Sequence, residues 1–172
     1  CGTQTAALGA AGFVSGPYPS GSTQVVEEYN GSSWTTVNSV PGSSGRASLT
    51  AAGLQTAALT VGGGPSNTNV SSEYDGTNWT SASNYPTTAA AMASGGTQND
   101  AIFNGNGGSG TTTALYNGTA WAAQNENAQG RHATGYMGQG AAEVTMTGGA
   151  PGSISATEEF TIPVGTATIT SS

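Results

Sequence analysis

The segment Tyr29-Asn30-Gly31-Ser32-Ser33-Trp34 is the first of three related segments in this chain of 172 residues, all with Tyr, Gly and Trp at the same spacing. It returns as Tyr74-Asp75-Gly76-Thr77-Asn78-Trp79 and as Tyr116-Asn117-Gly118-Thr119-Ala120-Trp121, so the tryptophans are 45 and then 42 residues apart. In a fourth copy Phe160 takes the place of the tyrosine and the tryptophan is lost. A fixed period of this length indicates repeated supersecondary units rather than a disordered low-complexity chain.

The residues between these segments predict strands joined by tight turns. Asn-Gly or Asp-Gly after each tyrosine favours a hairpin in which both turn residues have positive φ. We expect four strands per repeat, and in the second copy they fall near residues 46–52, 55–62, 70–74 and 78–82. Alanine and glycine crowd the first two strands and aromatic residues lie on the outer two, which suits a wedge-shaped, all-β blade with its thin edge near an axis.

Two further markers accompany each copy: a Gly-x-Gln element, as at Gly53 and Gly96, and a glycine run after the second strand, as at residues 62–64. Repeats with these markers and a spaced Tyr and Trp resemble kelch-type β-propeller blades, as in the galactose-oxidase-like central domain. The amino-acid sequences of these repeats are similar to those of kelch-like repeat proteins of marine bacteriophages. The resemblance implies a single propeller region over residues 1–172, either by itself or as part of a longer chain, with repeats at approximately 1–38, 46–82, 87–123 and 131–170.

The strand count leaves the closure of such a propeller open. The first copy lacks its innermost strand, so we expect three strands there, four in each of the next two copies and three or four in the last. A compact four-bladed ring, part of a longer chain and a ring completed by partners are all compatible with this count, and a longer chain is favoured. The alternating residues 166–170 are interpreted as an exit strand that could pair beside the first repeat and cover its edge.

Charge composition excludes several classes of function. The chain has nine acidic residues, two arginines and one histidine, for a formal charge of −7. Nucleic-acid binding needs many cations to displace phosphate counterions, so it is not expected. There is also no apolar run of about 18 residues that would insert into a membrane. The single cysteine, Cys1, cannot form an internal disulfide, and neither a metal site nor a cofactor is expected.

Catalytic chemistry finds little support in the sequence. Galactose-oxidase chemistry needs several histidines and tyrosines around copper, and His132 is the only histidine in this chain. Glycosidases need two carboxylates set apart for acid and base roles. Glu28, Glu73 and Glu159 instead each precede the aromatic marker, as members of a repeat do. We therefore predict that the protein is not an enzyme, and a secreted polysaccharide lyase or glycosidase remains the alternative.

The two arginines keep register with the repeat. Arg46 and Arg131 each follow a tryptophan by ten to twelve residues, at the start of an innermost strand. One hypothesis is that they bridge to a repeat carboxylate such as Glu73 or Glu28. The other is that they are solvated at the surface of the ring.

Residues that depart from the repeat are the candidates for ligand binding. In a propeller, the loops between the second and third strands and between successive repeats emerge on one face, and binding residues usually lie on loops. Tyr18 and Tyr85 could stack on a sugar ring or a peptide, with Asn125, Glu126 and Asn127 as polar neighbours. The sequence thus predicts a binding or structural module that recognises glycan or protein, extracellular or on a virion appendage such as a tail fibre or on a cell surface. Other subunits of the same assembly are expected partners, and a purely structural role is the third possibility.

Overall fold

The computed structural model describes residues 1–16, 20–42, 44–106, 110–130, 132–137, 143–149 and 158–161. Every regular element in these residues is a β-strand, which confirms the all-β expectation. The strands form four antiparallel sheets, each ordered as in the sequence. Sheet I contains β1 (Ala7–Phe13), β2 (Ser22–Tyr29) and β3 (Trp34–Val37). Sheet II contains β4 (Thr50–Leu54), β5 (Ala57–Val61), β6 (Ser71–Tyr74) and β7 (Trp79–Ser81).

The third and fourth sheets follow the same plan. Sheet III contains β8 (Ala93–Thr97), β9 (Asp100–Asn106), β10 (Gly110–Tyr116) and β11 (Trp121–Ala123). Sheet IV contains β12 (His132–Met137), β13 (Glu143–Gly149) and β14 (Glu158–Thr161). The expected strand numbers are confirmed among the described residues. β1 pairs with β2 in the way that β5 pairs with β6, and where sheet II has β4, sheet I has only Cys1 and Gly2, which pair with Leu8 and Ala7.

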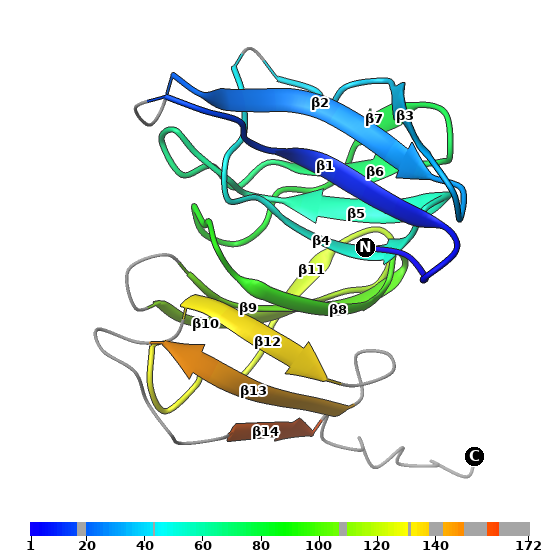
Figure 1. Ribbon diagram of the computed structural model, residues 1–172. Coiled ribbons are helices and arrows are strands. Elements are labelled where there is room, and N and C mark those ends of the chain that lie inside the picture. Colours follow the sequence, from blue (N-terminus) through cyan, green and yellow to red (C-terminus); the bar gives the residue numbers. More distant parts are fainter. Residues whose placement is uncertain are drawn as a thin grey trace, which may run out of the picture.

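The four sheets are arranged in chain order along an arc (Figure 1). The first strands β4 and β8 contact each other, as do β8 and β12, and β1 contacts β4. Sheets I and IV lie at opposite ends of the arc, so the described residues do not close into a ring (Figure 1). A compact four-bladed ring is therefore wrong for these residues. Residues 166–170, expected to pair beside the first repeat, lie outside the described part of the chain.

The hairpin turn between the last two strands differs from the expected type. Tyr29 pairs with Trp34 across a four-residue loop, and Asn30 Oδ1 accepts hydrogen bonds from the backbone N–H groups of Ser32 and Ser33, both at 3.0 Å. Asp75 and Asn117 hold their loops in the same way. Only the glycine has positive φ, as at Gly31 (+93°). The prediction of two positive-φ residues is wrong, because the side-chain oxygen satisfies the loop amides without a left-handed Asn or Asp.

Each repeated tyrosine packs against the tryptophan of its own hairpin. The ring centroids are 5.1 Å apart in sheet I, and 4.8 Å apart in sheets II and III. Phe160 pairs with Val144 in the backbone register in which Tyr74 pairs with Ala58. The fourth aromatic marker therefore holds the predicted position in the repeat.

Neighbouring sheets are joined by buried side chains and by two repeated hydrogen bonds. The hydroxyl of Tyr74 donates to Glu28 in sheet I at 2.8 Å, and the hydroxyl of Tyr116 donates to Glu73 in sheet II at 2.7 Å. The indoles of Trp79 and Trp121 likewise each donate, at 2.8 Å, to a carbonyl that follows the last strand of the preceding sheet. Two apolar clusters fill the spaces between sheets I and II and between sheets II and III. Glu28 and Glu73 are thus acceptors between sheets, which accounts for their fixed place in the repeat.

Candidate binding site

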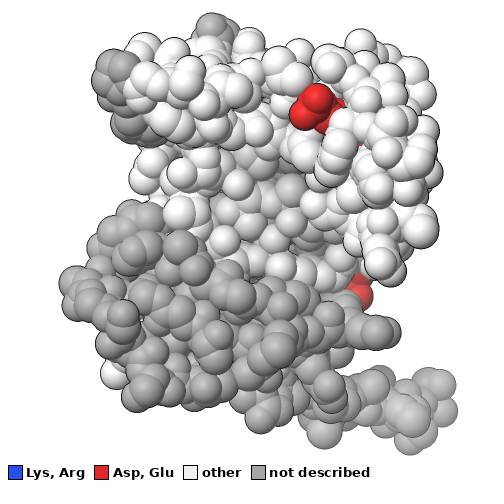
Figure 2. Space-filling view, viewed as in Figure 1, with Lys and Arg blue, Asp and Glu red and all other residues white. Residues whose placement is uncertain are grey.

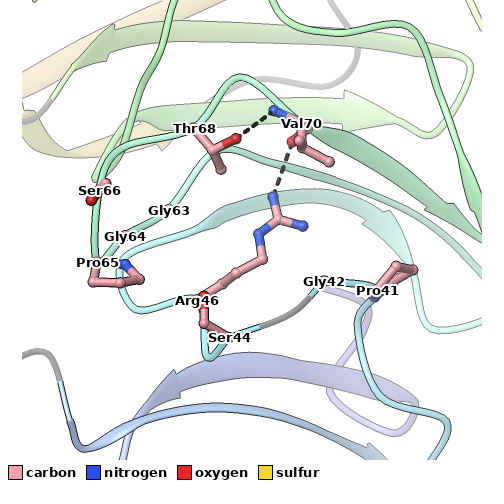
Figure 3. Close-up of a pocket in the computed structure, with 10 residues that line it drawn as sticks. All are labelled: Pro41, Gly42, Ser44, Arg46, Gly63, Gly64, Pro65, Ser66, Thr68 and Val70. Atoms are coloured by element: carbon pink, nitrogen blue, oxygen red, sulfur yellow. Dashed lines mark hydrogen bonds between the residues drawn. The ribbon is translucent and has the colours of Figure 1, made fainter.

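A pocket lies where two loops of the same face meet. The first loop connects sheet I to sheet II, and the second connects β5 to β6, so both belong to the loop classes expected to carry binding residues. The cavity has a volume of about 200 Å³. Figure 3 shows the lining residues, which are Pro41, Gly42, Ser44, Arg46, Gly63, Gly64, Pro65, Ser66, Thr68 and Val70.

Arg46 lies between the two loops with only 5% of its surface exposed. Its Nε and Nη2 both donate to the carbonyl of Gly62, at 2.9 and 2.5 Å, and Nη2 also donates to the carbonyl of Val70 at 3.0 Å (Figure 3 shows the bond to Val70). Nη1 is buried without a hydrogen-bond partner among the described residues. Burial lowers the pKa of this guanidinium.

Both sequence hypotheses for Arg46 are wrong. Glu28 and Glu73, its expected carboxylate partners, accept tyrosine hydroxyls instead, and Arg46 is not solvated. The physical reason is tertiary: the loop between β5 and β6, 16 to 24 residues further along the chain, turns its carbonyls inward within reach of an arginine that precedes β4. Arg131, its counterpart in the repeat, lies outside the described residues.

The glycine run explains how the loop after β5 packs closely against Ala47 and Leu49, which follow Arg46 in the chain. Gly63 has a φ of +95°, and a Cβ there would lie 2.9 Å from the side chain of Leu49 and 3.1 Å from the carbonyl oxygen of Ala47. The amides of Ala47 and Gly64 donate to each other's carbonyls, at 3.1 and 2.7 Å. Only a residue without a side chain fits at Gly63, so the run builds a wall of backbone rather than a simple strand end.

Tyr85 is not an exposed binding residue. Its side chain is 1% exposed, its hydroxyl donates to the carbonyl of Phe103 at 3.3 Å, and its ring lies edge-on to Trp121 with centroids 4.9 Å apart. Burial raises the pKa of its phenol. The amide N–H of Tyr85 donates to the carbonyl of Asn69, just before β6, and the amide N–H of the buried Val40 donates to the carbonyl of Gln24 in β2. The two residues thus hold equivalent loop positions, and both side chains point into the core.

The polar candidates lie on a different loop from the pocket. Asn125 and Glu126 are exposed, and a carboxylate oxygen of Glu126 accepts from the hydroxyl of Thr111 at 2.6 Å. Asn127 is partly buried and forms a reciprocal amide pair with Asn104, at 2.6 and 2.7 Å, which is a structural contact. Tyr18 lies outside the described residues.

The pocket therefore lies on the two classes of loop that the sequence indicated, but its lining residues are not the named binding candidates. The residues that line the pocket are mostly small, and Arg46 was interpreted from the sequence as a structural residue of the repeat. One available signal was the triplet at residues 62–64, where the later copies have doublets.

Groups that could support metal binding or a membrane-spanning helix are not found in the part of the chain that the structure describes. Three or more His, Cys, Asp or Glu side chains do not gather there as a potential metal site. No helix in those residues is long and apolar enough to cross a membrane.

Comparison with known proteins yields a likeness of fold. No family model and no curated protein matches the chain. Solved structures do match, among them one entitled "Structure of YjhT", with a TM-score of 0.65 and 16% sequence identity over 80% of this chain and 49% of that one. This chain thus spans about half the length of that protein. At this identity the likeness concerns the fold alone.

Proposed function

We propose that this chain forms part of a kelch-type β-propeller of four-stranded antiparallel blades. Three features support the proposal: the repeated strand order, the shared register of the aromatic markers, and the succession of sheets along an arc. On this proposal the four sheets are successive blades, and the first of them has only Cys1 and Gly2 at the place of its innermost strand.

We further propose that the propeller is a non-enzymatic binding module that recognises glycan or protein. The observation that carries this proposal is the pocket around Arg46, which lies between a loop joining two blades and a loop joining second and third strands. Propeller loops of these two classes share one face, and binding residues usually lie on loops. Assignment to a virion appendage or a cell surface follows from the resemblance of the repeats to kelch-like phage proteins.

The alternative, a polysaccharide-degrading enzyme, needs carboxylates free for acid and base chemistry. Glu28 and Glu73 are engaged with the tyrosine hydroxyls of the next sheet, and no acidic residue lines the pocket in the part of the chain that the structure describes. These contacts favour binding without turnover.

A glycan array probed with the whole chain tests the proposal. Ser66, which is exposed at the pocket, is changed to Trp to fill the cavity, and the exposed Thr36 of β3 is changed to Trp as a matched control. We expect binding that Ser66→Trp abolishes and Thr36→Trp preserves. Incubation of the chain with the bound glycan, followed by chromatography, should release no product. Product release would establish the enzyme alternative, and binding unaffected by Ser66→Trp would place recognition elsewhere.

A further inference from the structure

Arg46 is a buried cation whose hydrogen bonds are incomplete. Its three hydrogen bonds end on two carbonyl oxygens, and Nη1 has no acceptor in the described residues. Carbonyl dipoles orient a guanidinium but do not neutralise its charge. A buried charged donor without an acceptor costs more than a neutral one, so this site would gain from an acceptor that carries negative charge.

The surroundings of Arg46 leave its charge uncompensated. Among the described residues that line the pocket none is Asp or Glu, although the chain as a whole has a charge of −7. The lining offers hydroxyl groups on Ser44, Ser66 and Thr68. On the face shown in Figure 2, acidic side chains appear only at isolated points and no cationic surface is visible, in keeping with the burial of Arg46.

We propose that this pocket binds a carboxylate group of the ligand, with the guanidinium of Arg46 as the recognition group. The inference rests on the proposed binding function and names its ligand class, a sugar acid or another carboxylate-bearing unit. A carboxylate carries a single negative charge and supplies the acceptor that Nη1, the guanidinium nitrogen without a partner, lacks among the described residues. The cavity of about 200 Å³ is smaller than pockets that hold drug-sized ligands, so one terminal group enters it.

Titration of the whole chain with D-glucuronate and with D-glucose, followed by NMR or calorimetry, tests this inference. The two sugars differ in a single carboxylate. We expect glucuronate to bind at least about tenfold more tightly, because a hydrogen bond to a charged group is worth more than a neutral one. Equal affinity for the two sugars, or saturable binding of neither, would overturn the proposal.

A matched pair of variants tests the position of the carboxylate. Ser66 is exposed at the pocket, and Ser66→Glu adds a negative charge there whereas Ser66→Gln adds a neutral group of the same size. We expect Ser66→Glu to weaken glucuronate binding several-fold relative to Ser66→Gln, and added salt to reduce that difference. Identical affinities for the two variants would contradict the assignment.

A change of the arginine itself tests its role. Arg46→Lys keeps the positive charge but removes Nη1, the donor without a partner, so we expect at least about a tenfold loss of glucuronate affinity. Circular dichroism and urea unfolding check that this variant folds, and the Ser66 pair decides if it does not. Glycan-array binding that tolerates Ser66→Glu would leave the proposed function standing and refute the carboxylate site. Glucuronate binding without any signal on the glycan array would support the carboxylate site and contradict the proposed glycan recognition.

Discussion

At the scale of single residues, the repeated tyrosine hydroxyls bond to the preceding sheet in sheets II and III but not in sheet I, which begins the arc. Tyr74 donates to Glu28 of the preceding sheet at 2.8 Å. Tyr29 holds the same register position in sheet I, and its hydroxyl has no hydrogen-bond partner within the described residues. A tyrosine at this repeat position therefore joins two sheets in one case and forms no such bond in the other.

This difference predicts the outcome of removing one oxygen atom. We expect Tyr74→Phe to lower the free energy of unfolding by about 1–2 kcal/mol, because it leaves the Glu28 carboxylate without its donor. Tyr29→Phe is the matched control and should change stability by less than about 0.5 kcal/mol. Urea denaturation followed by circular dichroism measures both. Equal losses in the two variants would show that the hydroxyl between sheets is not what stabilises the fold.

The same hydroxyls make stability depend on alkaline pH. Burial, together with the hydrogen bond to a glutamate, raises the pKa of Tyr74 and of Tyr116 from 10.0 to about 12. The folded state thus prefers the neutral phenol, and this stabilisation is complete below pH 10.0 and is lost as the pH rises to about 12. The urea midpoint should fall across that range. The double variant Tyr74→Phe/Tyr116→Phe should show a smaller fall, and an equal fall would assign it to other groups.

At the scale of elements, the outermost hairpins show what a neighbouring sheet adds. The indole of Trp79 donates to the carbonyl of Asn38 at 2.8 Å, and its ring packs on the cluster between sheets I and II. Trp34 occupies the same place in sheet I but is 53% exposed. The two hairpins share the tyrosine, the glycine, the tryptophan and the register in which Tyr pairs with Trp, but among the described residues only sheet II follows another sheet in the arc.

Truncation of these tryptophans should therefore have unequal effects. We expect Trp79→Ala to lower the free energy of unfolding by about 2–4 kcal/mol, since it removes buried area and leaves a carbonyl unpaired. Trp34→Ala should cost less than about 1.5 kcal/mol because the ring is already half in water. Thermal and urea unfolding of both variants check the order, and a reversed order would contradict the described packing of sheet I.

Strand positions were largely predictable from the sequence, with one informative exception. Residues 55–62, 70–74 and 78–82 were expected as strands, and β5, β6 and β7 lie within them. The first strand was expected at 46–52 but runs over Thr50–Leu54. Ser48 has a φ of +58°, a conformation that interrupts a strand, and no residue pattern signals it at a serine.

At the scale of the whole molecule, the contacts between sheets change character along the arc. Leu115 pairs with Ile102 as Glu73 pairs with Leu59, so it holds the position of the acceptor glutamate in sheet III. Phe160 holds the position of the donor tyrosine in sheet IV. Between sheets III and IV, the positions of the Tyr–Glu pair are therefore held by two apolar residues, Phe160 and Leu115. The tyrosine and its glutamate acceptor are thus absent from the same pair of positions.

A double-mutant cycle tests this correspondence. Leu115→Glu alone should destabilise the fold, because it places a carboxylate without its tyrosine donor at a half-buried position. Adding Phe160→Tyr should recover at least about 1 kcal/mol relative to the sum of the single changes. Unfolding free energies of the four proteins give the coupling. Strictly additive effects would mean that sheets III and IV do not meet in the register of the other pairs.

The repeat period, the strand numbers and the places of the aromatic markers are local properties, and the sequence by itself determined them, because turn residues and alternating small side chains act over a few positions. The role of a side chain depended instead on its neighbours in space. Tyr85 was expected at the surface and is buried, because its segment folds back along its own sheet. Arg46 was expected to meet a carboxylate or water and instead meets carbonyls, because a distant glycine loop closes over it. Only the tertiary structure decided these roles, since burial and hydrogen-bond partners are set by chain segments that the local pattern does not contain.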